Sequence, residues 1–390
     1  MIDRDGNLVT DSGKQVPRLN ETANMFLNRT IAIYGPSGTG KTVITKHIMK
    51  LVSPHIQQCI IVAPTEPTNR SYAGFIDSTL IHYTLYKAPR PEDGVKKKDN
   101  PKAAAERFLK AIWDRQDMMA SIYKRANDII TLAALFNRLP KSERAYWLEH
   151  IVSFNDKREL LNKHAKRQFA HDAAKCRQAI NGINEKFKEM LMLIYKRAVV
   201  DNFGFLENIE DLTDDEQYSL RYVEFNPKLL LIFDDCAAQL KPFFNSDIFR
   251  RLFYQNRHSF ITVIVCCQDD TDLPANLRKN AFVSFFTDPI VCASNFDRKA
   301  NQFPKQTKDY VQAVVNNVFS TEIRKFAYIR EDPRRKHFYY IEAPLTPPFP
   351  FGSKALSELC DTVRSDGTSM DESNPYFGAF KLDGTKSRAT

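Results

Sequence analysis

The stretch that most constrains the fold is "TIAIYGPSGTGKT", residues 30–42, in which a short apolar run leads directly into a glycine-rich turn. It matches the pattern GxxxxGK[ST]. This pattern needs glycines so that successive backbone N–H groups can curl around a phosphate, and a following helix whose N-terminus faces the anion. We therefore expect one loop to bind nucleotide phosphates through Gly35, Pro36, Ser37, Gly38, Thr39, Gly40, Lys41 and Thr42.

The residues around this loop favour the same interpretation. "TIAIY" before it is typical of a buried strand, and "VITKHIMKLV" after it is typical of an amphipathic helix. In such a loop the lysine reaches the β- and γ-phosphates and the hydroxyl of the last residue ligates Mg²⁺. The sequence thus predicts ATP and Mg²⁺ as cofactors, with Lys41 on the phosphates and Thr42 on the metal.

Short apolar runs without polar alternation recur at long intervals along the chain. Runs of four to eight β-branched, aliphatic or aromatic residues are typical of strands buried on both faces of a parallel sheet. We expect an α/β fold, a P-loop NTPase core of the RecA/FtsK-like kind with a mostly parallel sheet, helices on both faces and a large α-helical insertion. The runs are "TIAIY" (30–34), "CIIVAP" (59–64), "KLLLIF" (228–233), "FITVIVCC" (260–267) and "AFVSFF" (281–286).

Two of these predicted strands end in polar residues suited to hydrolysis. "LLLIFDD" places Asp234 as the partner of the metal and Asp235 as the base or the residue that positions the attacking water. Glutamate is the usual residue at the second position, and aspartate is one methylene shorter. The next predicted strand ends in Gln268, where an amide can sense the γ-phosphate or hold the water.

The chain divides by composition into four parts. An N-terminal segment, 1–29, precedes an ATPase core made of 30–87 and 226–344. Residues 88–225 open with a charged, proline-containing linker and then show apolar residues at helical spacing, which predicts a helical insertion. "KFAYIR" (325–330) and "HFYYIEA" (337–343) predict a hairpin, and 345–390 is rich in Pro, Gly, Ser and Asp and is expected to be poorly ordered.

Composition restricts the setting in which the chain works. The formal net charge of +9 suits a polyanionic partner. The seven cysteines show no CxxC pairs and predict reduced thiols in an intracellular protein. The polar N-terminus lacks an apolar signal core, and no apolar run reaches the length of a membrane span, so we expect a soluble protein that is not secreted.

Taken in order, the motifs resemble the packaging-ATPase branch of the FtsK–HerA superfamily of P-loop motors, typified by poxvirus A32-like DNA-packaging ATPases. The matching pieces are "GPSGTGKT", "LLLIFDD", "NRHSFITVIVCCQD" and "DLPANLRKNAFVSFF". They cover residues 28–86 and 226–290. The chain departs from the family pattern at Asp235, where many motors have Glu, and at Asn256, where a Gly often precedes the Arg-His pair.

The resemblance implies an ATP-driven motor that moves double-stranded DNA into a viral capsid. It also implies a homo-oligomeric ring, a pentamer or hexamer, whose partners include capsid or portal-vertex proteins at a virus assembly site in the host cell and in the virion. In such rings an arginine of the neighbouring subunit stabilises charge on the γ-phosphate. Arg257 and Arg278 are the candidates by their places in the matching motifs.

The sequence leaves other functions open. One alternative is a helicase or terminase-like ATPase of another branch. Another is a nucleotide-binding assembly scaffold or switch with slow or no hydrolysis, which remains open because residue 235 is Asp.

A translocating motor binds DNA phosphates through Lys and Arg. The candidate DNA contacts are the basic runs 94–102, 162–178 and 331–336.

Overall fold

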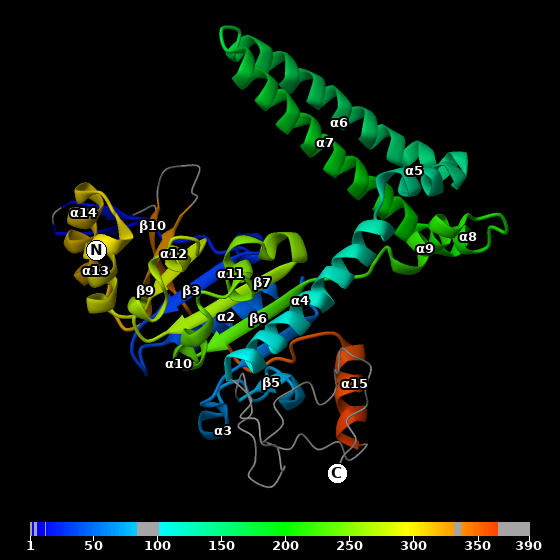
Figure 1. Ribbon diagram of the computed structural model, residues 1–390. Helices are drawn as coiled ribbons and strands as arrows, with labels where there is room; N and C mark the ends of the chain where they lie inside the picture. Colours follow the sequence, from blue (N-terminus) through cyan, green and yellow to red (C-terminus); the bar gives the residue numbers. More distant parts are fainter. Residues whose placement is uncertain (1, 4–5, 12, 84–100, 331–336, 366–390) are drawn as a thin grey trace. The chain divides into compact units, whose positions relative to one another are not determined.

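The computed structural model describes residues 2–3, 6–11, 13–83, 101–330 and 337–365 (Figure 1). The chain folds as two compact units. One consists of Met1–Asp117 and Lys228–Thr390, and the other is Met118–Pro227. The first unit is called the core unit below, and the second is called the helical unit.

An eight-stranded sheet forms the centre of the core unit (Figure 1). Five neighbouring pairs are parallel, which confirms the predicted mostly parallel sheet, and all five apolar runs identified in the sequence are strands. In spatial order the strands are β10 (Phe338–Glu342), β9 (Arg324–Ile329), β8 (Val283–Phe286), β3 (Thr30–Tyr34), β7 (Ile261–Cys267), β6 (Leu229–Asp234), β4 (Gln58–Val62) and β5 (Ile81–His82).

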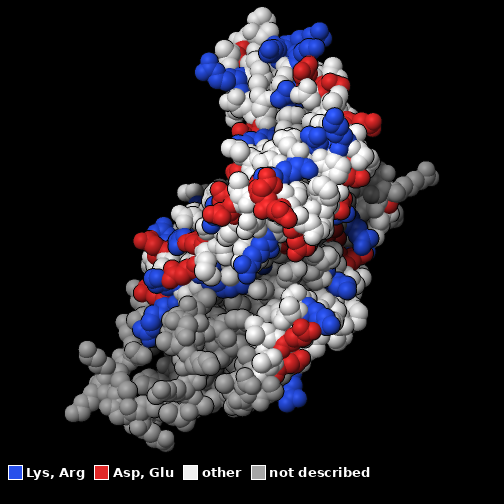
Figure 2. Space-filling model, turned by 90° about the vertical axis from the view of Figure 1, so that its right-hand side faces the viewer, with Lys and Arg blue, Asp and Glu red and all other residues white. Residues whose placement is uncertain are grey.

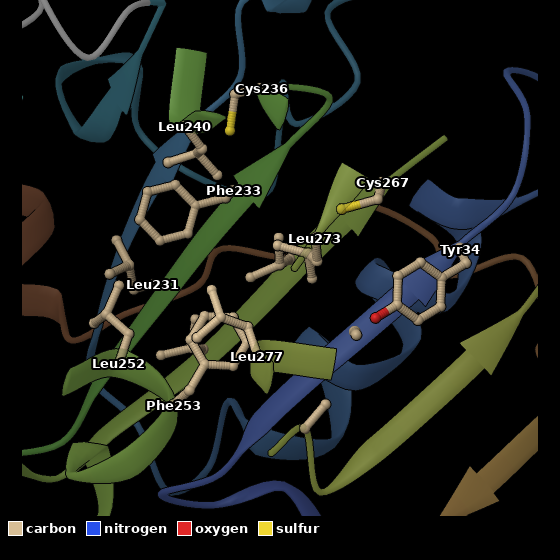
Figure 3. Packing of buried hydrophobic residues seen from close by; sticks show 14 of the residues in the cluster. Tyr34, Leu231, Phe233, Cys236, Leu240, Leu252, Phe253, Cys267, Leu273 and Leu277 are labelled. Carbon is tan, nitrogen blue, oxygen red and sulfur yellow. The ribbon is translucent and has the colours of Figure 1, made fainter. Parts of the chain in front are cut away.

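Both faces of this sheet are buried, as the lack of polar alternation predicts. Along β6, Leu231 and Phe233 face one hydrophobic cluster, while Leu230 and Ile232 face another on the opposite side. Figure 3 shows the first cluster, in which Phe233 lies among side chains contributed by neighbouring helices and strands. The sheet is therefore the middle layer of an α/β sandwich.

Helices cover the two faces. The face of the second cluster is covered by α2 (Lys41–Val52) and α15 (Lys354–Ser365). The opposite face is covered by the start of α4 (Pro101–Ala126) together with five helices that follow β6. These five are α10 (Ala237–Leu240), α11 (Asp247–Tyr254), α12 (Ala275–Arg278), α13 (Pro289–Asp297) and α14 (Lys305–Val318).

The core unit also contains a hairpin at one edge of the sheet and several short elements. β9 and β10 pair antiparallel, which confirms the predicted hairpin, and β9 continues the sheet antiparallel to β8. The predicted basic turn 331–336 lies outside the described residues, as do residues 94–100 of the basic run 94–102. The short elements are β1 (Leu8–Val9), β2 (Gln15–Val16), α1 (Ala23–Phe26) and α3 (Glu66–Asn69).

The helical unit is built on a long antiparallel hairpin of α6 (Lys141–Gln168) and α7 (Ala173–Asp201). Near the open end of the hairpin, α5 (Ile129–Arg138) and α8 (Phe203–Glu207) pack against α7, and α9 (Asp214–Tyr222) packs against α5 and α8. The small core there contains Leu132, Leu135, Phe136, Leu139, Ala198, Val199, Leu206, Leu220 and Val223. The rest of the hairpin toward the α6–α7 turn is mostly exposed.

The structure departs from the sequence-based boundaries in two places. The helical unit starts at Met118 rather than at 88, because Phe108, Ile112 and Trp113 of α4 are buried in the core unit. The segment expected to be poorly ordered from 345 contains α15, whose Leu356 and Cys360 are buried against the sheet. Composition alone missed this helix because a Pro- and Gly-rich stretch precedes it; residues 366–390 lie outside the described part.

Candidate nucleotide site

The glycine-rich loop connects the central strand β3 to α2. Gly35 has no room for a side chain, because a Cβ there would overlap the hydroxyls of Thr287 and Thr39. Those two hydroxyls lie 2.6 Å apart and tie the loop to the end of β8. Lys41 Nζ donates to the carbonyl oxygens of Gly35 and Pro36 at 2.6 and 2.9 Å, so the lysine is held across its own loop.

A second lysine approaches the loop from the other end of the sequence. Gly40 has φ of 100°, a left-handed conformation that favours glycine, and a Cβ on it would come within 3.4 Å of Cε of Lys325. Lys325 lies on β9, and burial lowers the pKa of its ammonium group. This residue is not recognisable in the sequence, because nothing in "KFAYIR" distinguishes a lysine of a binding site from any other lysine of a strand.

Asp234 ends the fully buried strand β6 and is itself only 6% exposed. Burial raises the pKa of its carboxyl group, while a hydrogen bond from Tyr72 and the charge of Lys41 oppose that rise. Tyr72 Oη donates to Asp234 Oδ2 at 2.7 Å. The tyrosine is fully buried, so it fixes the orientation of this carboxylate.

Asp235 and Gln268 lie together, as their positions after adjacent strands predict. Gln268 Nε2 donates to Asp235 Oδ1 at 2.9 Å. Asp235 adopts a left-handed backbone conformation with φ of 53°, which turns the chain sharply after β6. The backbone N–H of Gln268 donates to Asp272, so the loop after β7 is also held in place.

The two candidate arginines lie in different surroundings. Arg278 has a side chain only 8% exposed, which forms an ion pair with Asp270 at 3.2 Å and donates to Asn301 at 3.1 Å. Its guanidinium group is thus engaged within its own chain. Arg257 is exposed in a 3-10 helix just before β7, at the edge of the sheet opposite to the glycine-rich loop. Since β7 spans roughly 20 Å, Arg257 lies far from the loop of the same chain.

Basic side chains gather at the closed end of the helical hairpin, which is at the top of Figure 2. Between Lys163 and Arg177 the chain carries five Lys and Arg residues and one acid, Asp172. These five side chains are exposed, whereas Asp172 caps α7 and pairs with Lys175 at 3.1 Å. We call the exposed bases of this segment the basic tip; they are Lys163, Lys166, Arg167, Lys175 and Arg177.

Together these features define a P-loop NTPase fold. The glycine-rich loop follows the central strand, an aspartate ends the strand two places away, and a glutamine follows the strand between them. Ligands of open α/β sheets bind at the carboxyl ends of such strands, where the strand order switches direction.

In the part of the chain that the structure describes, none of the helices is long and apolar enough to cross a membrane.

The chain belongs to the family of protein B354L of African swine fever virus. It is 48% identical over 375 residues to the protein of isolate Pig/Kenya/KEN-50/1950, a match that covers 96% of this chain and 99% of that protein. The protein of isolate Warthog/Namibia/Wart80/1980 is 47% identical over the same length. No protein-family model matches the sequence.

Solved structures with a similar fold have little sequence in common with this chain. The genome packaging NTPase B204 of Sulfolobus turreted icosahedral virus 2, in complex with ATP-gammaS, aligns with a TM-score of 0.32 and 10% identity, covering 82% of this chain and 98% of that one. VirB4 of Thermoanaerobacter pseudethanolicus aligns with a TM-score of 0.35 and 12% identity, covering 89% and 99%.

Proposed function

We propose that the protein is a Mg²⁺-dependent ATPase that translocates double-stranded DNA into a viral capsid as part of a homo-oligomeric ring. The observation that carries the hydrolase part is the grouping of Lys41, Asp234 and the Asp235–Gln268 pair after three adjacent parallel strands. The packaging part rests on the motif resemblance and on a family whose members are viral proteins. Virus assembly in the infected cell is the setting that fits both.

The residues near the loop fit a magnesium ion. Thr42, in the first turn of α2, and Asp234 offer a hydroxyl and a carboxylate oxygen, the hard donors that Mg²⁺ takes along with water and phosphate oxygens. When bound, the ion neutralises charge that develops on the phosphates. Tyr72 supports this role because its hydrogen bond holds the carboxylate of Asp234 in one orientation.

The chain's own residues divide the remaining work. The backbone N–H groups of the loop and the ammonium group of Lys41 bind the phosphates, and Asp235 with Gln268 positions the attacking water. An arginine from the neighbouring subunit completes the site, and Arg257 fits this better than Arg278, because Arg257 is exposed while Arg278 is paired with Asp270. The basic tip of the helical unit is the proposed contact for the DNA backbone.

The direct test is ATP turnover with and without double-stranded DNA at low and moderate salt, for the wild type and for Asp235→Asn. We expect DNA to raise turnover, salt to weaken that stimulation because phosphate contacts are electrostatic, and the variant to abolish hydrolysis. ATP binding without turnover under any of these conditions would instead favour an assembly scaffold or switch. Turnover that responds equally to single-stranded DNA would favour a helicase-like motor.

A further inference from the structure

A glutamate that the proposed chemistry does not use lies beside the same site. Glu66 begins α3, four residues after Val62 at the carboxyl-terminal end of β4, and it is only 5% exposed. β4 pairs in parallel with β6, with Val62 opposite Phe233, so the chain leaves β4 next to Asp234. Carboxyl ends of adjacent parallel strands lie at the same edge of a sheet, which places this glutamate at the edge that binds phosphates.

The two carboxylate oxygens of Glu66 differ. Oε1 accepts the backbone N–H of Tyr72 at 2.8 Å, and the hydroxyl of the same tyrosine donates to Asp234. Oε2 is buried and has no hydrogen-bond partner among the described residues. A buried carboxylate oxygen without a partner is costly, so such an atom calls for a water or a ligand group.

Burial and the neighbouring groups together set the pKa of this carboxylate. Burial raises the pKa of Glu66, although the backbone N–H groups of Tyr72 and Ser71 and the charge of Lys46 oppose the rise. A carboxylate with a raised pKa is a stronger proton acceptor than an exposed one. Asp235, by comparison, already accepts a hydrogen bond from Gln268 through Oδ1, and its side chain is one methylene shorter.

We propose that Glu66 is a catalytic base of the hydrolysis, which holds the attacking water through Oε2 and accepts its proton. The inference rests on the proposed ATPase function. As the water oxygen forms its bond to the γ-phosphorus, the bond from that phosphorus to the bridging oxygen breaks. The bridging oxygen leaves with the electron pair on ADP, and one proton of the water passes to Glu66. Asp235 and Gln268 then orient the water. In this arrangement the catalytic glutamate follows β4, the neighbour of β6, whereas the glutamate of many motors stands at the position of Asp235.

The test compares Glu66→Gln with the wild type and with Glu358→Gln, a control at an exposed glutamate that pairs with Lys354 on its own helix. Glutamine can still accept the N–H of Tyr72 but takes up no proton. We expect Glu66→Gln to bind a fluorescent ATP analogue within about threefold of the wild type and to lose about 100-fold or more in single-turnover hydrolysis. The control should match the wild type in both measurements.

The outcomes separate the inference from the function on which it rests. Turnover of Glu66→Gln within twofold of the wild type overturns the inference and leaves the ATPase intact. Parallel loss of nucleotide binding and turnover also overturns it, because the glutamate would then only hold the loop that carries Tyr72. Should Glu66→Gln fail to fold, Glu66→Asp is measured in its place. Turnover of Glu66→Asp equal to that of the wild type would also overturn the inference. A wild type without any hydrolysis refutes both proposals.

Discussion

A single hydrogen bond links the metal ligand of the proposed site to a part of the chain that carries no motif. Tyr72 and Asp234 are separated by 162 positions in the sequence, and their side chains meet at 2.7 Å. Partners of this kind fix the orientation of a ligand and are nearly as important to a metal site as the ligands themselves. The site therefore extends beyond the glycine-rich loop and the acidic strand.

Replacing Tyr72 by Phe removes the donor to Asp234 and keeps the buried ring. We expect the Mg²⁺ concentration needed for half-maximal nucleotide binding to rise about 10-fold, while binding measured without Mg²⁺ stays unchanged. A Mg²⁺ titration of a fluorescent ATP analogue measures both. Tyr83→Phe, a change of the same size elsewhere in the core unit, is the matched control. Equal Mg²⁺ dependence of Tyr72→Phe and wild type would contradict this role.

The sequence predicts some site residues and misses others for a physical reason. Asp234 and Gln268 are recognisable because each stands at the end of an apolar run, and Lys41 because it stands in the GxxxxGK[ST] pattern after a strand. Glu66 and Tyr72 come from a segment of one short helix and turns, without periodicity, and only the folded chain brings Tyr72 to Asp234 and Glu66 to Tyr72. Pairings across such a distance leave no local pattern that a single sequence displays.

Among the secondary-structure elements, too, some features are predictable from the sequence and others are not. The buried strands are predictable because both faces of the sheet exclude polar residues over several positions. The sequence predicts α4 as a helix but cannot assign it to a unit. Apolar residues in its first part are buried in the core unit, and its residues from Met118 onward belong to the helical unit. Which core a helix joins depends on tertiary contacts rather than on its period.

The start of α9 in the helical unit makes stability depend on pH. Glu216, in the first turn, closes a capping box with Thr213 and accepts hydrogen bonds from Arg138 at 2.8 and 3.0 Å. Burial tends to raise the pKa of Glu216, but the hydrogen bonds from Arg138 and Thr213 outweigh it and hold the pKa below its usual value. The stabilisation is therefore present above the unfolded pKa of about 4.3 and is lost as the pH falls through the folded pKa.

Glu216→Gln should destabilise the helical unit by about 1–3 kcal/mol at pH 7, because Arg138 loses its charged partner. Hydrogen exchange of the amides of α5 and α9 in the full chain measures this as faster opening. At acidic pH, below the folded pKa of Glu216, the difference between variant and wild type should shrink. Glu207→Gln in α8, where the side chain is exposed, is the control. A difference that persists unchanged at acidic pH would argue against the charged pair as its source.

The basic tip belongs to the hairpin as an element. Changing Lys166 and Arg167 to Gln should weaken binding to double-stranded DNA and reduce the slope of log K against log salt by about 2, because two phosphate contacts are lost. Lys186→Gln with Lys188→Gln is the matched control, with the same loss of charge further along α7. Fluorescence anisotropy at several salt concentrations gives both slopes. Equal slopes for the two double variants would remove the tip from the DNA contact.

At the scale of the whole molecule, the proposed role of Arg257 depends on a second copy of the chain. Arg257 and the glycine-rich loop lie at opposite edges of the same sheet, so Arg257 would act on the nucleotide of a neighbouring chain. Arg257→Ala and Lys41→Ala should each be inactive alone. Mixed in equal amounts they should recover about a quarter of wild-type turnover, from sites with an intact loop and an intact neighbour.

The control for this mixture pairs Lys41→Ala with Asp234→Asn. Both residues belong to the site of one chain, so no combination of these two variants restores a complete site. Recovery in the first mixture and none in the second supports a shared site in a ring. If neither mixture recovers activity while Arg257→Ala alone remains active, Arg257 has no role across the interface.

Hydrolysis of ATP at the loop between β3 and α2 is tested by phosphate release from Mg·ATP by the full chain, with the wild type compared with Lys41→Ala. The lysine spans its own loop in the structure, held by the carbonyl oxygens of Gly35 and Pro36, so it is placed to contact phosphates. We expect steady phosphate release by the wild type and a loss of at least about 100-fold in the variant. Equal release by both proteins would show that hydrolysis does not take place at this loop.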